Sequence, residues 1–332
     1  MKIAFFDIEE WEKNSIDDKL KGNEVSFITE SLTQETITYA LDADIICIFI
    51  YSTLGKEILE KLPHVKAIVT RTTGYDHIDI DYCKAHNITV MNVPTYGVHT
   101  VAEQTFGLIL SLTRKLIPSI ERTRKGDFTI DGLRGIDLYG KTLGVIGAGK
   151  IGHSVVEIAV GFGMKVLIYS HHEDAEMKKM GDVTFVSLDE LLGSSDIITL
   201  HLPLTKETEY IVNKENIGKI KKGAFLINTA RGGLIETEAV VQALEQGILA
   251  GAGLDVLEEE CYLREEHELL HRKFLETCNL KTQLLNHALL DKENVLITPH
   301  NAFNTKEAVS EILDISIEDI KSFLQGKPQN TV

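Results

Sequence analysis

The chain has 332 residues, of which 43% are hydrophobic and 25% are charged, and its formal net charge at pH 7 is -16. This length exceeds the size at which one hydrophobic core usually stops growing, so we expect two domains. The acidic charge disfavours nucleic acid as a partner, and no apolar run approaches the length of a membrane span.

Short apolar runs alternate with helical patterns over the first hundred residues. We expect strands at 3–6, 45–49, 67–69 and 89–91. Alternation of this kind predicts a parallel α/β sheet.

The segment from Thr100 to about Arg124 has apolar residues at helical spacing, and only Gly107 and Pro118 interrupt it. This spacing predicts one long, well-buried helix. Periodicity does not separate a core helix from a helix at an interdomain or dimer contact, so both interpretations stay open.

A second α/β unit is expected from Lys141 onward. Its predicted strands are 143–146, 166–169, 197–200, 225–227, 253–256 and 295–297. Residues 257–294 form a long, charge-rich insertion that we interpret as an irregular or helical excursion, without an assigned role. The last thirty residues are typical of one amphipathic helix or two.

The four cysteines lie far apart and include no C-x-x-C pair. Their spacing suggests neither a disulfide framework nor a zinc site, and we predict no bound metal. Because free thiols persist in a reducing compartment, we expect a cytoplasmic protein.

A glycine-rich loop follows the predicted strand at 143–146. Gly147, Gly149 and Gly152 form a G-x-G-x-x-G pattern, and a helical pattern follows them. Between a strand and a helix, such glycines permit a tight turn and let backbone N–H groups approach a pyrophosphate, whose charge the helix N-terminus favours. The pattern therefore predicts a dinucleotide site.

The end of the next strand departs from the usual dinucleotide pattern. An acidic residue normally binds the ribose hydroxyls of NAD there, but this sequence has Ser170, His171 and His172. Loss of the carboxylate removes repulsion of the 2′-phosphate of NADP, yet no arginine lies nearby to bind that phosphate. The choice between NAD and NADP therefore stays open.

Charged residues follow three later strands. Arg231 comes after one strand, Asp255 and Glu258–Glu260 lie at the end of the next, and His300 follows the last. Ligands bind at the carboxyl edge of open parallel sheets, where these residues would meet. A guanidinium to hold a carboxylate, a proton donor and a carboxylate beside it are what hydride transfer to a 2-keto acid requires. The acidic triplet leaves open which glutamate takes part.

Motifs over nearly the whole chain resemble the D-isomer-specific 2-hydroxyacid dehydrogenase family, most closely its D-lactate dehydrogenase branch. They are the glycine loop and the segments Arg71–Asp79, Asn92–Pro94, Val101–Glu103, His201–Pro203, Asn228–Gly232, Leu254–Val256 and Thr298–His300. Because so many motifs occur in one order, the resemblance is specific.

The resemblance implies two Rossmann/flavodoxin-like domains, each a doubly wound parallel α/β sheet, with the active site in a cleft between them. Residues 1–98 and 302–332 would form the substrate-binding domain, and residues 99–301 the dinucleotide-binding domain. It also implies a homodimer, with a small 2-keto or 2-hydroxy acid as the partner molecule.

The same resemblance implies the site residues. Arg231 would bind the substrate, His300 would be the acid/base, and Glu260, five residues after Asp255, would be the catalytic glutamate. The implied substrate contacts are Phe49, Thr73, Gly74, Tyr96, Arg231 and Phe303. The implied cofactor contacts are Gly147, Gly149, Lys150, Ile151, Gly152, Ser170, His201, Pro203, Thr229, Ala230 and Asp255.

Reduction of pyruvate to D-lactate is the reaction that the resemblance favours, with NAD as the cofactor and NADP as the alternative that Ser170 leaves open. The alternatives within the enzyme class are a hydroxypyruvate or glyoxylate reductase and a reductase of bulkier 2-keto acids. An alternative of another class is an NAD(H)-sensing corepressor, which shares this fold. It would need a partner-binding extension, and the sequence suggests none outside the two domains.

Overall fold

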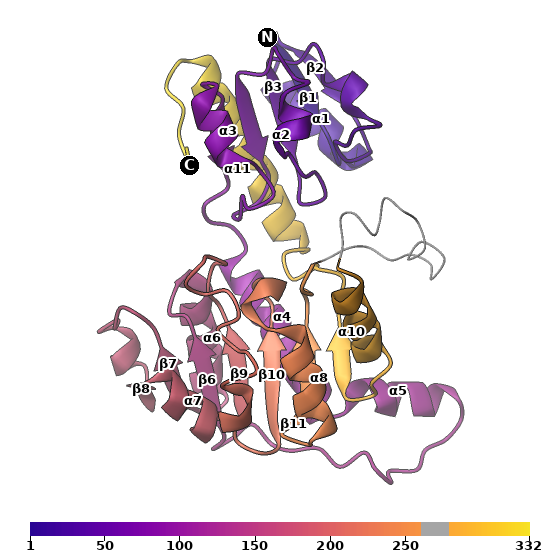
Figure 1. Cartoon of the computed structure of the whole chain (residues 1–332), viewed down its shortest axis with the longest axis vertical. Coiled ribbons are helices and arrows are strands. Elements are labelled where there is room, and N and C mark those ends of the chain that lie inside the picture. The colour runs from indigo at the N-terminus through magenta and orange to yellow at the C-terminus, as the bar shows by residue number, and fades with distance from the viewer. Residues whose placement is uncertain (260–278) are drawn as a thin grey trace. The chain divides into compact units, whose positions relative to one another are not determined.

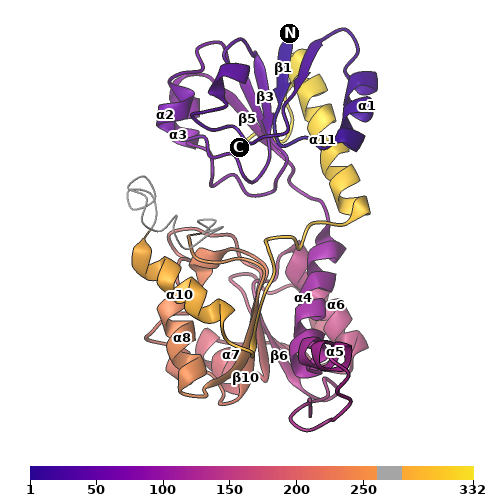
Figure 2. The ribbon, with the colours of Figure 1, turned by 90° about the vertical axis from the view of Figure 1, so that its right-hand side faces the viewer.

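The computed structural model describes residues 1–259 and 279–332, which form two compact units (Figure 1). The first unit comprises Met1–Gly97 and Asn304–Val332, and the second lies within Val98–Phe303. Each unit contains a parallel β-sheet with helices on both faces (Figure 2). The predicted fold class, two doubly wound parallel-sheet domains, is confirmed.

The sheet of the first unit has the strand order β2-β1-β3-β4-β5. Its strands are β1 (Lys2–Phe5), β2 (Glu24–Phe27), β3 (Ile45–Ile48), β4 (Ala67–Thr70) and β5 (Thr89–Asn92). Its helices are α1 (Glu10–Lys19), η1 (Ile37–Tyr39), α2 (Lys56–Leu59), α3 (Ile80–Ala85) and α11 (Lys306–Leu324). Alternate side chains of β1 enter opposite cores: Ile3 packs with α1 and α11, and Ala4 packs with α2 and α3. This alternation places helices on both faces.

The sheet of the second unit has the strand order β12-β11-β10-β9-β6-β7-β8. Its strands are β6 (Thr142–Ile146), β7 (Lys165–Tyr169), β8 (Val183–Phe185), β9 (Ile197–Leu200), β10 (Ala224–Asn228), β11 (Leu249–Leu254) and β12 (Val295–Ile297). Its helices are α4 (Val98–Thr113), α5 (Leu116–Arg124), α6 (Lys150–Gly161), η2 (Met177–Lys179), α7 (Leu188–Ser194), η3 (Ile217–Lys219), η4 (Gly232–Leu234), α8 (Thr237–Glu245) and α10 (Leu280–Leu290). Helices α4 and α6 pack on one face, and α7, α8 and α10 pack on the other.

Two strands, β2 and β8, were not among the predicted apolar runs. Both lie at an edge of their sheet. No residue of β2 is fully buried, and its exposure alternates along the strand. An edge strand contacts only one neighbour and stays partly in water, so its sequence lacks the continuous apolar run of a central parallel strand.

The expected single, well-buried helix over residues 100–124 is wrong. The chain forms α4 and α5, separated at Lys115, whose backbone is left-handed with φ 50°. The carbonyl of Thr113, at the end of α4, accepts a hydrogen bond from the N–H of Ile136 instead of continuing the helical ladder. Pro118 lies in the first turn of α5, where its missing N–H costs little. Helix α5 has no buried residue.

Helices also form in the last thirty residues and in the insertion at 257–294. The last thirty residues contain one long helix, α11, and residues 280–290 of the insertion form α10. Residues 260–278 of the insertion lie outside the described residues. Among the helices that the structure describes, none is long and apolar enough to cross a membrane.

The buried Asp319 of α11 generates a pH-dependent prediction. Its Oδ1 accepts a hydrogen bond of 2.8 Å from Asn330 Nδ2, and burial raises the pKa of Asp319 to about 6 from an ordinary value of 3.8. A carboxyl whose pKa is raised by folding stabilises the protein below its unfolded pKa, and this contribution is lost as the pH rises through the folded pKa. Asp319→Asn keeps the acceptor for Asn330 without the charge.

We therefore expect Asp319→Asn to match the unaltered chain in stability near pH 4 and to exceed it at pH 8, by on the order of 2 kcal/mol. Urea unfolding at both pH values measures the difference. Glu311→Gln, at an exposed position of the same helix, is the control and should show no such change. An equal effect of Asp319→Asn at the two pH values would contradict the assignment.

Candidate active site

One row of paired residues crosses six strands of the second unit's sheet close to their carboxyl ends. The row runs Tyr169, Ile146, Leu200, Asn228, Leu254, Ile297. The residue that follows each member therefore leaves the sheet at the same edge. The residues in these positions are Ser170, Gly147, His201, Thr229, Asp255 and Thr298. The register thus brings five of the eleven predicted cofactor positions to one edge.

The glycine loop leaves β6 at the point where the strand order reverses, since β7 lies on one side of β6 and β9 on the other. Such a switch point opens a crevice at the carboxyl edge of a parallel sheet. Gly147 has φ 107°, and a Cβ there would overlap the carbonyl of His201. A Cβ at Gly152 would overlap the carbonyl of Gly147. These two positions therefore require glycine.

Gly149 differs from the other two glycines because open space surrounds its missing side chain. It is the N-cap of α6, and Lys150 and Ile151 are the first residues of that helix. A helix N-terminus presents free backbone N–H groups and favours an anion. The uncovered backbone at Gly149 therefore fits the pyrophosphate of a dinucleotide.

The neighbouring strand ends carry Ser170 and His201. Ser170 follows β7, and its Oγ lies 3.4 Å from the backbone N of His172. His201 follows β9, where its Nε2 lies 2.9 Å from Thr199 Oγ1. Burial lowers the pKa of His201 to about 3, so this imidazole is neutral at physiological pH. Next to it, the carbonyl of Pro203 accepts a hydrogen bond from Thr208 Oγ1.

The arginine loop, residues 229–231, leaves β10 and is held by polar contacts. Asn228 uses both ends of its amide, because Oδ1 accepts from the N–H of Ala230 at 3.0 Å and Nδ2 donates to the carbonyl of Arg231 at 2.8 Å. Thr229 Oγ1 lies 2.9 Å from Thr105 Oγ1 of α4. The Arg231 Nη1 donates to the carbonyl of Ala230 at 2.8 Å. Contacts of Asn228 and Thr229 thus hold the loop that carries Arg231.

The buried carboxylate of Asp255 connects the ends of β11 and β12. It accepts hydrogen bonds from the Thr298 hydroxyl and from the backbone N–H groups of Asn301 and Ala302, the last two at 3.1 and 2.9 Å. The Asp255 carbonyl accepts from the N–H of His300 at 2.9 Å. His300 has a left-handed backbone with φ 50°, uncommon for a residue other than glycine. Asp255 therefore holds the turn that carries His300.

The structure describes two residues of the acidic triplet Glu258–Glu260. Glu258 Oε1 accepts from the Tyr210 hydroxyl at 2.5 Å, and Glu259 Oε2 accepts from the N–H of Asn279 at 2.8 Å. Glu260, the predicted catalytic glutamate, lies outside the described residues. In the described ranges, no group of three or more His, Cys, Asp or Glu side chains could hold a metal ion.

The first unit carries Phe49, Thr73, Gly74 and Tyr96, which follow β3, β4 and β5. Phe303 is the last residue of the second unit. The Thr73 carbonyl accepts from Asn92 Nδ2 at 2.7 Å, and the Phe49 backbone N–H donates to Asp7 Oδ2 at 3.3 Å. These contacts fix two of the predicted substrate-binding segments within this unit.

Arg71 contacts Phe49 and Asp7. Its guanidinium donates to Glu12 Oε1 at 2.6 Å and to the carbonyl of Asp7 at 2.7 Å, and lies 5.1 Å from the centre of the Phe49 ring. Both members of the Arg71–Glu12 ion pair are almost fully buried. A buried pair of this kind is expensive to disrupt, because either partner alone would be an unpaired buried charge.

Sequence reasoning missed the side chains that hold the site: Glu12, Thr105, Tyr210 and Asn286. Each joins segments far apart in the sequence. Only a contact map could have revealed these pairs, although a charged residue within a predicted helix, such as Glu12, is a weak signal.

Comparison with known proteins agrees with this geometry. Residues 106–302 match the family model described as D-isomer specific 2-hydroxyacid dehydrogenase, NAD binding domain. A 2-hydroxyacid dehydrogenase homolog from Zymomonas mobilis is 38% identical, and the match covers 98% of each chain. An aromatic 2-oxoacid reductase from Clostridium sporogenes is 40% identical over 93% of this chain and 92% of its own.

The crystal structure of D-lactate dehydrogenase from Aquifex aeolicus, complexed with NAD and lactic acid, has a TM-score of 0.86 and 37% sequence identity. That match covers 98% of this chain and 96% of the other. The glycine loop at the switch point, the aligned strand ends and these near full-length matches lead to one conclusion: the chain belongs to the D-isomer-specific 2-hydroxyacid dehydrogenase family.

Proposed function

We propose that this chain reduces a small 2-keto acid to the D-2-hydroxy acid, with pyruvate and D-lactate as the leading pair. One observation carries the proposal: Arg231, Asp255 and the His300 turn follow three adjacent parallel strands, on the edge that also carries the glycine loop. The resemblance to the D-lactate dehydrogenase of known structure supports the choice of substrate.

The proposed roles of the chain's residues follow from their chemistry. A nicotinamide cofactor, when bound, supplies the hydride that adds to the carbonyl carbon. Arg231 binds the substrate carboxylate, because a planar guanidinium pairs with it through two hydrogen bonds. The imidazolium of His300 donates a proton to the carbonyl oxygen, and Glu260 stabilises the charged imidazole. Glu260 is proposed because the family's catalytic glutamate lies five residues after the aspartate that Asp255 matches, while Glu258 and Glu259 accept hydrogen bonds from Tyr210 and Asn279.

The remaining contacts are proposed as the resemblance implies them. Residues 99–301 bind the dinucleotide, and residues 1–98 with 302–332 bind the substrate. The proposed substrate contacts beside Arg231 are Phe49, Thr73, Gly74, Tyr96 and Phe303. The proposed cofactor contacts are Gly147, Gly149, Lys150, Ile151, Gly152, Ser170, His201, Pro203, Thr229, Ala230 and Asp255.

A second candidate substrate class is the bulkier 2-keto acids. The Clostridium sporogenes relative, at 40% identity, is an aromatic 2-oxoacid reductase. Phe49 also presents an apolar ring where some lactate enzymes of the family have a tyrosine. An aromatic ring without a hydroxyl suits an apolar substrate side chain better than a polar one.

A steady-state assay with pyruvate, hydroxypyruvate and phenylpyruvate, each with NADH and NADPH, tests these assignments. We expect His300→Gln to lower kcat by about 100-fold or more, because the proton donor is lost. Arg231→Gln should also raise the KM for the keto acid, because the carboxylate loses its cation.

Lys56→Gln, a substitution of an exposed lysine in α2, is the matched control and should leave both constants unchanged. Turnover by His300→Gln close to that of the unaltered chain would exclude the role given to His300. Tight dinucleotide binding without turnover on any keto acid would instead favour a nucleotide-sensing protein.

We propose NAD as the cofactor, with NADP as the alternative that Ser170 leaves open. Ser170→Asp should lower the ratio of kcat/KM with NADPH to that with NADH by about tenfold or more, because a carboxylate repels the 2′-phosphate. Thr184→Asp adds the same charge at an exposed position of β8 and should leave the ratio unchanged. A ratio that is insensitive to Ser170→Asp would exclude Ser170 from the ribose site.

We propose that the chain forms a homodimer through the segment 116–139. Its exposed apolar residues are Leu116, Ile117, Ile120, Phe128, Ile130, Ile136 and Tyr139. Exposed apolar surface of this kind is typical of protein contacts, and Ile130 is 83% exposed. One chain has a mass of 37.0 kDa, and sedimentation should give twice this mass. The Ile130→Asp variant should sediment as a monomer. Tyr39→Asp, at an exposed site of the first unit, should remain dimeric. A monomeric unaltered chain would contradict the proposal.

A cytoplasmic location is also proposed. Cys47 and Cys83 are both free and buried, and burial raises the pKa of the Cys47 thiol to about 12. Such thiols are unreactive, and unpaired cysteines are common in proteins of reducing compartments.

A further inference from the structure

Two loops at the carboxyl edge of the second unit lie in direct contact. The arginine loop continues from Arg231 into η4, and the chain leaving β11 passes beside it at Leu257. A Cβ at Gly232 would overlap the Leu257 carbonyl, so only glycine fits there. A shift of the Leu257 segment would therefore be transmitted to the residue that follows Arg231.

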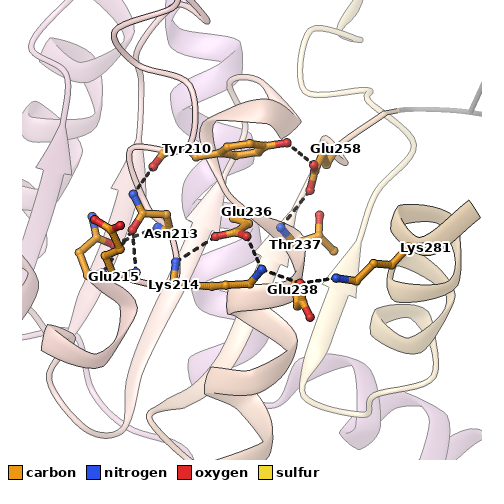
Figure 3. A network of polar contacts seen from close by, with 10 residues as sticks. Tyr210, Asn213, Lys214, Glu215, Glu236, Thr237, Glu238, Glu258 and Lys281 are labelled. Carbon is orange, nitrogen blue, oxygen red and sulfur yellow. Dashed lines mark hydrogen bonds and ion pairs between the residues drawn. The ribbon is translucent and has the colours of Figure 1, made fainter. Parts of the chain in front are cut away.

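Tyr210 contacts both loops. Its backbone N–H donates to the carbonyl of Gly233 at 2.9 Å. Its hydroxyl donates to Glu258 Oε1 at 2.5 Å (Figure 3). The residues after it run beside the arginine loop, since the N–H of Val212 donates to the carbonyl of Leu234 at 3.2 Å. One residue thus joins the segment after Arg231 to the segment after Asp255.

The backbone of Tyr210 is held in a conformation that suits this role. It is left-handed with φ 50°, which costs free energy in a residue other than glycine. Its carbonyl accepts a hydrogen bond of 2.8 Å from Asn213 Nδ2 (Figure 3). The hydrogen bond to Glu258 raises the pKa of the Tyr210 phenol, so the hydroxyl stays protonated and donates throughout the physiological pH range.

Glu258 extends the connection to two helices. Its Oε2 accepts from the N–H of Thr237 at 3.0 Å, at the first residue of α8 (Figure 3). A carboxylate at a helix N-terminus is stabilised by the helix dipole. Asn286 Nδ2 of α10 donates to the Glu258 carbonyl at 3.0 Å. Contacts with α8 and α10 therefore hold Glu258, which in turn binds the Tyr210 hydroxyl.

We propose that Tyr210 and Glu258 are positioning residues, whose mutual hydrogen bond fixes the arginine loop so that Arg231 meets the substrate carboxylate. This inference rests on the proposed function. Neither side chain needs to touch the substrate for this role. Thr229 and Ala230, the proposed cofactor contacts of the arginine loop, precede Arg231, whereas Tyr210 contacts Gly233, which follows it. The glycine loop and Ser170 follow other strands, so the contact should affect keto-acid binding more than dinucleotide binding.

The test compares Tyr210→Phe, Glu258→Ala and the double variant with the unaltered full-length chain. We expect each single variant to raise the KM for the keto acid by about tenfold, with the KM for NADH within about twofold of its original value. The KM of the double variant for the keto acid should not exceed that of the more impaired single variant, because both substitutions remove the same contact. Lys281→Met, which removes an exposed pair with Glu238 in the same region (Figure 3), should change neither constant.

Thermal unfolding of each variant shows whether a change in KM comes from the position of the arginine loop or from a general loss of stability. Equal rises in both KM values, or multiplicative losses in the double variant, would overturn the proposal, as would an unchanged Tyr210→Phe enzyme. Tyr210→Phe retains the ring, so it should fold even if Glu258→Ala does not. If the unaltered chain reduces no keto acid, the proposed function fails, and this role with it. A failure confined to the variants leaves the proposed function intact.

Discussion

The register of the seven-stranded sheet is the constraint on which the rest of the second unit depends. In a parallel sheet, the hydrogen-bond ladder fixes which residue of one strand lies beside which residue of the next. Here it aligns Ile146, Asn228 and Leu254 in one row, so the glycine loop, the arginine loop and Asp255 leave the sheet together. A shift of one residue in a strand would turn its side chains to the opposite face.

The register delivers residues to an edge, and polar contacts between the loops then determine their orientation. The Asp255 carboxylate is almost fully buried, and its donors are the Thr298 hydroxyl and the N–H groups of Asn301 and Ala302. Because a buried charge is costly unless it is hydrogen-bonded, this carboxylate strongly favours the turn that satisfies it. The left-handed backbone of His300 follows from that turn.

The sequence predicts the parts of this structure that depend on local pattern. Central strands such as β6 and β10 appear as apolar runs, and Gly147 and Gly152 lie where backbone segments approach too closely for any side chain. The same reasoning overlooks β2 and β8, whose edge positions leave no apolar run. It also extends α4 through Lys115, because the bond between Ile136 and Thr113 that ends this helix joins residues far apart in sequence.

The acidic triplet shows why site assignment needs more than spacing. Three consecutive glutamates are equivalent in a pattern, yet Glu258 has its partner Tyr210 48 residues away in the sequence. That partner lies in a loop without regular periodicity, so no local signal indicates it. Contacts between residues so far apart in the sequence decide which of several similar residues stabilises the structure and which takes part in the reaction. Glu258 stabilises the loops through the hydrogen bonds that its carboxylate accepts from Tyr210 and Thr237, whereas an acidic residue that acts on a histidine must have its carboxylate beside the imidazole.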